Sequence, residues 1–224
     1  MKTRVLSLLY FLTGILFIIL ENNSSALTQF IFKALIIPWL IIILILNVKP
    51  LMNRLNLLVI AGLLFSWAGD MVLQFTFIPG LILFLMTHVM YLTVFIITPG
   101  KNVIFTKRSY LLIIVLIYGA LLVYLLYGDL GDMRLPVLVY AIIILAMLAA
   151  AINRLEKVNR PSYWLVLAGA ILFVISDSAI AINKFSWDFN YSSVVIMLTY
   201  IAAQYLITIG FLKQYPLKQI PEII

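Results

Sequence analysis

The chain contains no cysteine and a single histidine among its 224 residues. The absence of cysteine excludes disulfides, thiolate metal sites and cysteine nucleophiles. One histidine without any cysteine does not supply the usual ligand set of a zinc site. The sequence also lacks a Walker loop, a GxSxG elbow, an HExxH motif and a dinucleotide-binding fingerprint. We therefore expect neither a metal nor a cofactor.

Charge is also scarce, and this excludes a soluble globular fold. A soluble domain carries about 25% charged residues, whereas this chain has 10%, with 65% apolar residues and a mean hydropathy of +1.18. A bilayer-spanning helix needs about 20 mainly apolar residues, and the chain consists almost entirely of such segments. The composition therefore predicts an all-α fold, a polytopic membrane protein whose eight transmembrane helices form a bundle in a single domain.

The apolar segments are separated by short polar links and by proline or glycine. Pro79-Gly80 predicts a tight turn before the fourth segment. The first segment follows Lys2 and Arg4, and we interpret it as a retained helix rather than a signal peptide, because a basic flank also anchors a helix on the inner side. The expected helices span residues 5–20, 28–48, 55–75, 81–98, 109–127, 135–152, 161–184 and 191–212.

The basic residues, which give a net charge of +7, are divided unequally between the two sides of the predicted bundle. The side that we expect to face outward has three of the basic residues, Lys33, Arg134 and Lys184. The positive-inside rule therefore places both termini in the cytoplasm, and we expect a bacterial inner membrane. Scattered charges of this kind indicate orientation rather than a nucleic-acid surface, so the expected surroundings are the lipid bilayer, with no nucleic acid. The residues expected on the cytoplasmic side are Lys2, Arg4, Lys49, Arg54, Lys101, Lys107, Arg108, Arg154, Lys157, Arg160, Lys213 and Lys218.

Two aspartates lie inside apolar segments. Asp70 lies in Gly62–Phe75 (GLLFSWAGDMVLQF), and Asp177 lies in Gly169–Phe185 (GAILFVISDSAIAINKF). In both segments the aspartate follows the opening glycine by eight residues. Because an ionisable group is costly at membrane depth, such a residue marks a functional site by default. Both segments are expected to run outward, which places each carboxyl roughly 5–12 Å below the outer boundary at about 1.5 Å per residue.

The two halves of the chain share a second similarity. LMTHVMY (residues 85–91) resembles MLTYIAAQY (residues 197–205), and each follows an aspartate-bearing segment. Equivalent segments are four apart and point the same way. The pattern is consistent with a parallel four-plus-four internal repeat and specifies no oligomeric state.

Further polar side chains accompany the aspartates. Ser66 and Asp70 are four residues apart and share one helix face, while His88 and Tyr91 are one turn apart. Because lipid cannot hydrogen-bond these groups, their faces must point into the bundle. Besides Asp70 and Asp177, which we expect to be catalytic, the candidate substrate-binding residues are Lys33, Ser66, His88, Tyr91, Asn183, Lys184, Tyr200 and Gln204.

Each of these residues also has a purely structural interpretation. Either aspartate could pair with Lys33, Lys184 or His88 and hold helices together. Lys33 could instead extend to the membrane surface, and the tyrosines could be ordinary packing residues. These alternatives remain open from the sequence.

The segments that carry these residues resemble the YhhN-like family of eight-helix membrane proteins, whose characterised members include lysoplasmalogenases. The resemblance extends through most of the chain. It implies hydrolysis of the vinyl-ether bond of a lysophospholipid, giving a fatty aldehyde and a glycerophospho-base. The matching motifs are FSWAGDMVL, HVMY, the segment with Pro136 and Tyr140, FVISDSAIAINKF and YIAAQ.

This chemistry suits a pair of carboxyl groups. A vinyl ether is hydrolysed by slow protonation of its β-carbon, and water then captures the resulting oxocarbenium ion. A carboxyl group that is buried beside a second carboxylate retains its proton more readily, so the two groups can share one proton. Glycoside hydrolysis uses two carboxyl groups around a similar cation.

We therefore hypothesise that Asp70 and Asp177 face each other as general acid and general base, in either order. The remaining candidates would bind the substrate: His88, Tyr91 and Tyr200 would position water and the leaving oxygen, and Lys33 or Lys184 would hold the phosphate. A transporter or scramblase with a proton-titrating aspartate pair is the alternative, and a non-catalytic scaffold is a third possibility.

The hypothesis of a carboxyl pair predicts the result of two isosteric substitutions. Asp70→Asn and Asp177→Asn should each abolish aldehyde release from a lysoplasmenyl lipid, since each removes one partner of the acid–base pair. Both variants should still be extracted from the membrane as folded protein. Turnover retained in both variants would reject the pair.

Overall fold

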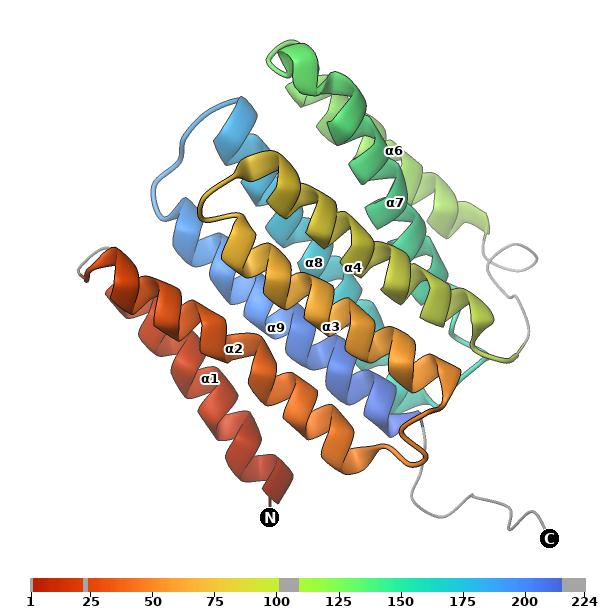
Figure 1. Cartoon of the computed structure of the whole chain (residues 1–224). Helices are drawn as coiled ribbons and strands as arrows, with labels where there is room; N and C mark the ends of the chain where they lie inside the picture. The colour runs from red at the N-terminus through yellow and green to blue at the C-terminus, as the bar shows by residue number, and fades with distance from the viewer. Residues whose placement is uncertain (1, 22–23, 101–108, 215–224) are drawn as a thin grey trace, which may run out of the picture.

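The computed structural model describes residues 2–21, 24–100 and 109–214, and these form a bundle of long helices (Figure 1). Within this part of the chain eight helices are long and apolar enough to cross a membrane, and there is no strand. The predicted all-α polytopic bundle is therefore confirmed. The helices are α1 (Lys2–Leu20), α2 (Ala26–Asn47), α3 (Arg54–Val72), α4 (Phe77–Ile97), α6 (Ser109–Leu126), α7 (Arg134–Ile152, preceded by a 3-10 turn, Gly131–Met133), α8 (Arg160–Phe185) and α9 (Ser192–Lys213).

Polar residues define where several helices begin. The side chain of Asn53 accepts a hydrogen bond from the backbone N–H of Leu55 at the start of α3, and Asn159 accepts one from Ser162 at the start of α8. Such N-caps satisfy backbone donors that have no partner within the helix. Short polar links thus give sharp helix starts in an otherwise apolar chain.

The prediction of a tight turn at Pro79-Gly80 is wrong, because both residues are helical and lie at the start of α4. The chain turns earlier, after α3 ends at Val72. Proline fits a first helical turn because its missing N–H would have no intrahelical partner there. Glycine is needed next to it, since a Cβ on Gly80 would lie 2.7 Å from the Cα of Leu73. The close approach of α3 and α4 therefore explains the Pro-Gly pair.

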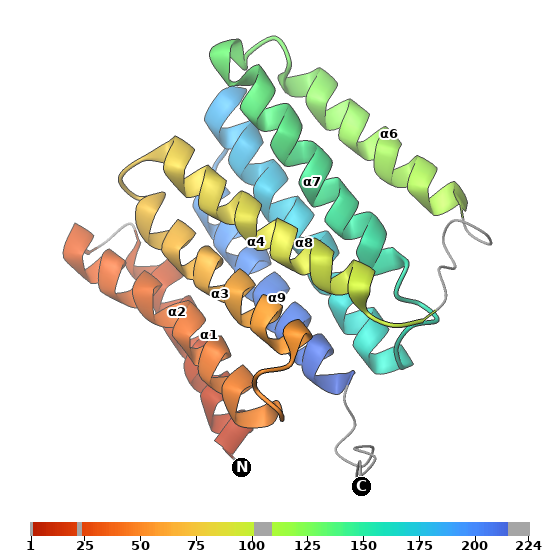
Figure 2. The ribbon, with the colours of Figure 1, turned by 45° about the vertical axis from the view of Figure 1, so that its right-hand side comes forward.

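Four helices form the centre of the bundle (Figures 1 and 2). The helix α3 packs along α4, and α8 packs along α9, while α4 also contacts α7. The helices α1 and α2 pair on one side, and α6 stands at the opposite edge, where it packs against α7 and α8. Both aspartate-bearing helices, α3 and α8, therefore lie in the interior.

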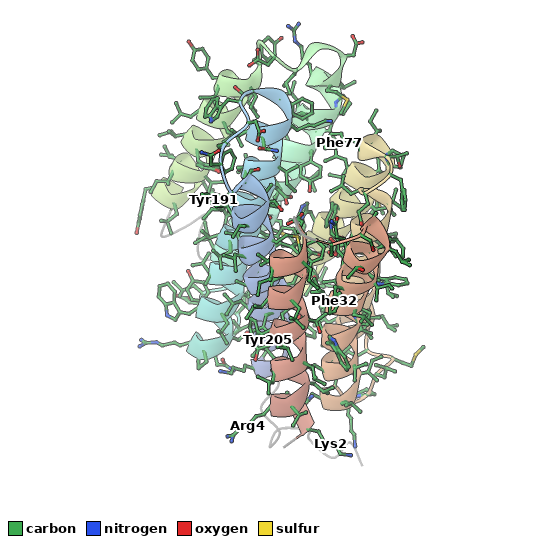
Figure 3. All side chains as sticks on the ribbon, turned by 90° about the vertical axis from the view of Figure 1, so that its left-hand side faces the viewer. Lys2, Arg4, Phe32, Phe77, Tyr191 and Tyr205 are labelled. Atoms are coloured by element: carbon green, nitrogen blue, oxygen red, sulfur yellow. The ribbon has the colours of Figure 1, made fainter. Side chains whose placement is uncertain are left out.

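The outer surface is apolar and the charged residues lie at the helix ends. Large side chains such as Leu8, Leu27 and Leu116 are exposed, as expected when lipid surrounds the bundle. Figure 3 shows Lys2 and Arg4 at one end of α1. The start of α1 and the end of α9 lie at the same end of the bundle. Four basic residues used for the predicted orientation lie outside the described residues, namely Lys101, Lys107, Arg108 and Lys218.

Arg154 departs from the expectation of a charge at the surface, because it is completely buried. Its guanidinium donates to Gln214 Oε1 at 2.8 Å and to Ser162 Oγ at 3.3 Å, and lies 5.0 Å from the centre of the Phe95 ring. These contacts join the ends of α4, α7, α8 and α9. Arg154 therefore holds one end of the bundle together.

Glycine permits close contact at the helix interfaces. A Cβ on Gly62 of α3 would lie 2.7 Å from the Tyr91 ring of α4. A Cβ on Gly169 of α8 would lie 2.9 Å from the backbone oxygen of Ala203 in α9. The glycines that open the two similar aspartate segments thus both face the following helix. The internal repeat itself stays a prediction.

Enlarging Gly169 should destabilise the protein. Gly169→Val places methyl groups against the α9 backbone, which cannot move aside as a flexible side chain would, and overpacking of this kind costs about 1–3 kcal/mol. We expect the thermal transition in detergent, followed by tryptophan fluorescence, to fall by several degrees. Gly128→Val is the control, because nothing lies within 4 Å of a Cβ at Gly128. Equal transitions in the two variants would contradict the proposed close contact.

Candidate active site

Three side chains from different helices meet at Asp177, and we call them the Asp177 cluster (His88, Tyr140 and Asp177). The hydroxyl of Tyr140 in α7 donates to Asp177 Oδ2 at 2.5 Å. His88 Nε2 in α4 lies 2.8 Å from the same oxygen and 2.8 Å from the Tyr140 hydroxyl. The structural alternative in which Asp177 pairs with His88 is thus realised, with Tyr140 as a third member.

The hydrogen-bond network fixes the position of the imidazole proton. His88 is fully buried, and its Nδ1 has no hydrogen-bond partner among the described residues. Nε2 faces two acceptors, because Tyr140 uses its own proton on Asp177. A neutral imidazole places its proton where an acceptor is available, so His88 donates through Nε2. Asp177 Oδ2 therefore receives two donors.

The other oxygen of Asp177 is left for a ligand. In the described part of the chain Asp177 Oδ1 makes no hydrogen bond, and it is not fully buried. The Asp177 side chain is 9% exposed. One carboxylate oxygen is thus held in place by the protein, and the other remains accessible.

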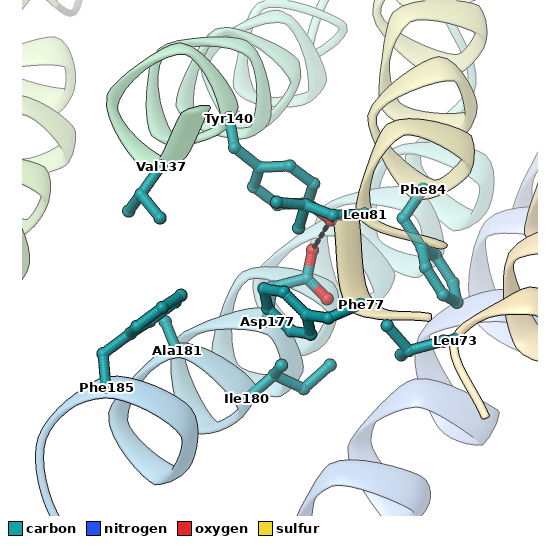
Figure 4. Close-up of a pocket in the computed structure, with 10 residues that line it drawn as sticks. All are labelled: Leu73, Phe77, Leu81, Phe84, Val137, Tyr140, Asp177, Ile180, Ala181 and Phe185. Carbon is teal, nitrogen blue, oxygen red and sulfur yellow. Dashed lines mark hydrogen bonds between the residues drawn. The ribbon is translucent and has the colours of Figure 1, made fainter. Parts of the chain in front are cut away.

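Asp177 and Tyr140 line two apolar pockets. The first, which we call the α4 pocket, is bordered by Phe77 and Phe84 of α4 and by Phe185 of α8 (Figure 4). The second, the α6 pocket, lies between α6, α7 and α8. The residues common to both pockets are Val137, Tyr140, Asp177 and Ala181.

Asp70 ends a second network, the Asp70 cluster (Ser66, Asp70, Tyr91, Tyr200 and Gln204). Tyr91 donates to Gln204 Oε1 at 2.8 Å, and Gln204 Nε2 donates to Ser66 Oγ at 2.7 Å. Ser66 Oγ lies 2.7 Å from the hydroxyl of Tyr200, which donates to Asp70 Oδ2 at 2.6 Å. Because Tyr200 uses its proton on Asp70, Ser66 must donate to Tyr200. Every donor in the network therefore points toward the Asp70 carboxyl.

The two clusters are neighbours but are separated by an aromatic ring. Phe173 meets the His88 ring nearly at right angles at 4.7 Å and the Tyr200 ring at 5.7 Å. Asp70 is 2% exposed and does not line the α4 or the α6 pocket. No hydrogen bond or ion pair joins the two carboxyl groups within the described ranges. Their direct pairing stays a prediction.

The other candidates lie outside these clusters. Lys184 is exposed, and its ammonium group lies 5.2 Å from the centre of the Phe77 ring at the α4 pocket. Lys33 lies 5.6 Å from the centre of the Phe17 ring and close enough to Asp70 for charge attraction. Asn183 has a buried Oδ1 without a partner among the described residues. Of the two lysines predicted to bind the phosphate, Lys184 contacts a residue that lines a pocket, whereas the ring beside Lys33 lines neither pocket.

Sequence reasoning missed Tyr140 and Phe173 as site residues. Tyr140 is surrounded by apolar residues in α7, so no polar face marked it. Its one signal was its position in a segment with family resemblance. Phe173 is fully buried among many other aromatic residues of the chain. Only its ring contacts with His88 of α4 and Tyr200 of α9 reveal its place between the two clusters.

A comparison with family models matches residues 28–211 to the YhhN family. Among curated proteins, the chain is similar to lysoplasmalogenase TMEM86A of Bos taurus, with 36% identity over 68% of this chain and 64% of that protein. It is also similar to lysoplasmalogenase TMEM86B of Homo sapiens, with 33% identity over 68% of this chain and 62% of that protein. A lysoplasmalogenase of Mycobacterium bovis is 28% identical over 68% of this chain and 59% of that protein.

The matches cover only part of each relative. The chain spans less than two thirds of the length of these curated relatives. No solved structure matches it at a comparable level. The region matched by the family model includes every residue of the Asp177 and Asp70 clusters.

The assignment of the imidazole proton can be tested directly, because the chain has one histidine. Selective ¹⁵N labelling of histidine gives a single pair of ring signals in an NMR spectrum. In the neutral ring we expect the proton on Nε2, and Tyr140→Phe should shift the Nε2 signal because it removes a neighbour of that atom. The matched control, Tyr91→Phe, alters the Asp70 cluster alone and should leave the signal in place. A proton on Nδ1 would contradict the network.

Proposed function

The chain belongs to the YhhN family, and we propose that it is an intramembrane hydrolase that cleaves the vinyl-ether bond of lysoplasmalogen-type lysolipids. The products would be a fatty aldehyde and a glycerophospho-base. One observation carries the proposal: a carboxylate held by two donors reaches apolar pockets between helices. The names of the relatives support the substrate class.

In the first step Asp177 acts as the general acid. Its Oδ1 transfers a proton to the β-carbon of the vinyl ether, whose π electrons form the new C–H bond and leave an oxocarbenium ion. Tyr140 and His88 already donate to Oδ2, so they stabilise the carboxylate that forms when the proton leaves. Donors fixed in advance where charge develops contribute strongly to catalysis in a water-poor site.

In the second step the same carboxylate acts as the base. Water adds to the cationic carbon and returns a proton to Asp177, which is regenerated as the acid. The resulting hemiacetal collapses: the bond between carbon and the glycerol oxygen breaks, the aldehyde forms, and the hydroxyl proton passes to the glycerol oxygen. Acid and base duty by one carboxyl has a parallel in retaining glycosidases.

In this mechanism Asp70 is a positioning residue. It holds the hydroxyl of Tyr200, whose ring packs edge-on against Phe84 and Phe173. Phe84 borders the α4 pocket and Phe173 contacts His88. The Asp70 cluster therefore supports the walls around Asp177, and the two aspartates form a functional pair without direct contact.

Lys184 is the proposed partner of the lipid phosphate. It is exposed and lies beside Phe77 at the α4 pocket, near the end of α8. A lysolipid would then place its headgroup near Lys184 and its vinyl ether at Asp177. With both termini in the cytoplasm, as the charge distribution predicts, the headgroup lies at the outer boundary of a bacterial inner membrane.

The proposal is tested by aldehyde release from lysoplasmenyl lipid with purified protein in detergent. We expect turnover in the wild type, and a transporter would show none, because transport needs a sealed vesicle. The geometry predicts a larger effect on turnover for Asp177 than for Asp70. Asp177→Asn should lower kcat by about 10²–10⁴-fold, the usual contribution of a general acid.

Asp70→Asn should cause a smaller loss than Asp177→Asn, because an asparagine oxygen can still accept from Tyr200. Tyr200→Phe removes this hydrogen bond and should therefore cause a larger loss than Asp70→Asn. Lys184→Met should raise KM more than it lowers kcat. Lys213→Met, at an exposed lysine in the last turn of α9, serves as the control for the phosphate contact. An active Asp177→Asn variant would refute the assignment.

A further inference from the structure

The α6 pocket does not end at Asp177. A further pocket follows it along α6, α7 and α8, and Tyr118 and Val174 line both. The further pocket is bordered by Tyr110 and Ile114 of α6 and by Trp164 of α8. We call the two together the α6 groove. It extends from the accessible carboxylate toward the beginning of α8.

The α6 groove has the length of a lipid chain. Asp177 and Trp164 are thirteen positions apart in α8, which is about 20 Å at ~1.5 Å per residue. Half of a bilayer's hydrocarbon core is about 15 Å thick. The groove is therefore long enough for one extended hydrocarbon chain of an ordinary membrane lipid.

The lining of the groove fits the same occupant. Apart from Asp177, its polar groups include the hydroxyl of Tyr118 and that of Ser178, which lie 2.7 Å apart. Ser178 donates to the backbone oxygen of Val174, so Tyr118 donates to Ser178. Mutual bonding leaves these hydroxyls satisfied where the two pockets meet. Where the two pockets meet, a hydrocarbon chain thus contacts apolar side chains and two hydroxyls that need no ligand.

The helix α6 is also the least enclosed part of the wall. Its buried residues are Val115, Gly119 and Leu126, whereas side chains such as Leu116 and Leu121 are exposed. It packs against α7 and α8 at one edge of the bundle (Figure 2). A chain can reach the groove sideways from the bilayer along this edge.

We propose that the α6 groove binds the hydrocarbon chain of the lysolipid and thereby makes cleavage depend on chain length. This rests on the proposed function. The vinyl ether lies at Asp177, and the glycerol part extends past the α4 pocket so that the headgroup lies near exposed Lys184. The chain runs past Tyr118 and Val174 toward Trp164. Ile114 and Trp164 contact the distal part of a long chain only.

The first test compares two lysoplasmenyl lipids, one with a chain that spans a leaflet and one with a chain too short to pass Tyr118. Ile114→Trp should lower kcat/KM for the long chain at least fivefold and leave the value for the short chain unchanged. Ile113→Trp is the matched control. It is the neighbouring isoleucine, similarly exposed at 56% against 59%, and it does not line the groove. The same ratio of long-chain to short-chain kcat/KM in both variants would overturn the proposal.

The second test needs no turnover and so separates this proposal from the proposed function. A lysophospholipid with a diazirine at the end of its chain is photolysed with the wild-type protein, and labelled peptides are identified by mass spectrometry. We expect labels within residues 110–118 and 164–175. Labels spread evenly over exposed apolar faces, including that of α1, would show a bulk-lipid contact and overturn the proposal. If the labels are spread in this way while the wild type still hydrolyses the lipid, the proposal of the α6 groove fails and the proposed function stands.

Discussion

The two hydrogen bonds that Asp177 Oδ2 receives from Tyr140 and His88 are the interaction on which the rest of the site depends. Hydrocarbon offers a carboxylate no partners, so an unpaired one at this depth would be costly. Here the partners come from α4 and α7, and the bonds therefore fix three helices relative to one another. The same bonds leave Oδ1 accessible. The contact that stabilises the bundle thus also leaves one carboxyl oxygen free for the proposed reaction.

The second carboxyl group, that of Asp70, lies in a different environment. Asp70 lies at the end of a network in which each donor points toward it, and its burial keeps it from the pockets. Phe173 stands between the clusters and contacts a ring of each. A buried network of linked hydrogen bonds restricts the movement of its side chains. The Asp70 cluster is therefore suited to hold the aromatic walls in place.

Much of this arrangement is contained in the sequence. Apolar segments of sufficient length predict the eight helices, and the spacing of Ser66 and Asp70 predicts a polar face turned inward. The partners of that face are harder to predict, because helices that are apolar all round have no stripe to show which side packs. Tyr140 and Phe173 were missed for this reason. How the two aspartates lie relative to each other depends on which helices are neighbours, and single-helix periodicity carries no such information.

In the proposed mechanism the scissile bond lies at Asp177. An experimental structure with an uncleavable alkyl-ether lysolipid would test this placement. We expect the carbon that corresponds to the vinyl β-carbon to lie within about 3.5 Å of Asp177 Oδ1, the separation of a near-attack arrangement. A bound lipid whose ether lies at Asp70, or away from both carboxyl groups, would contradict it.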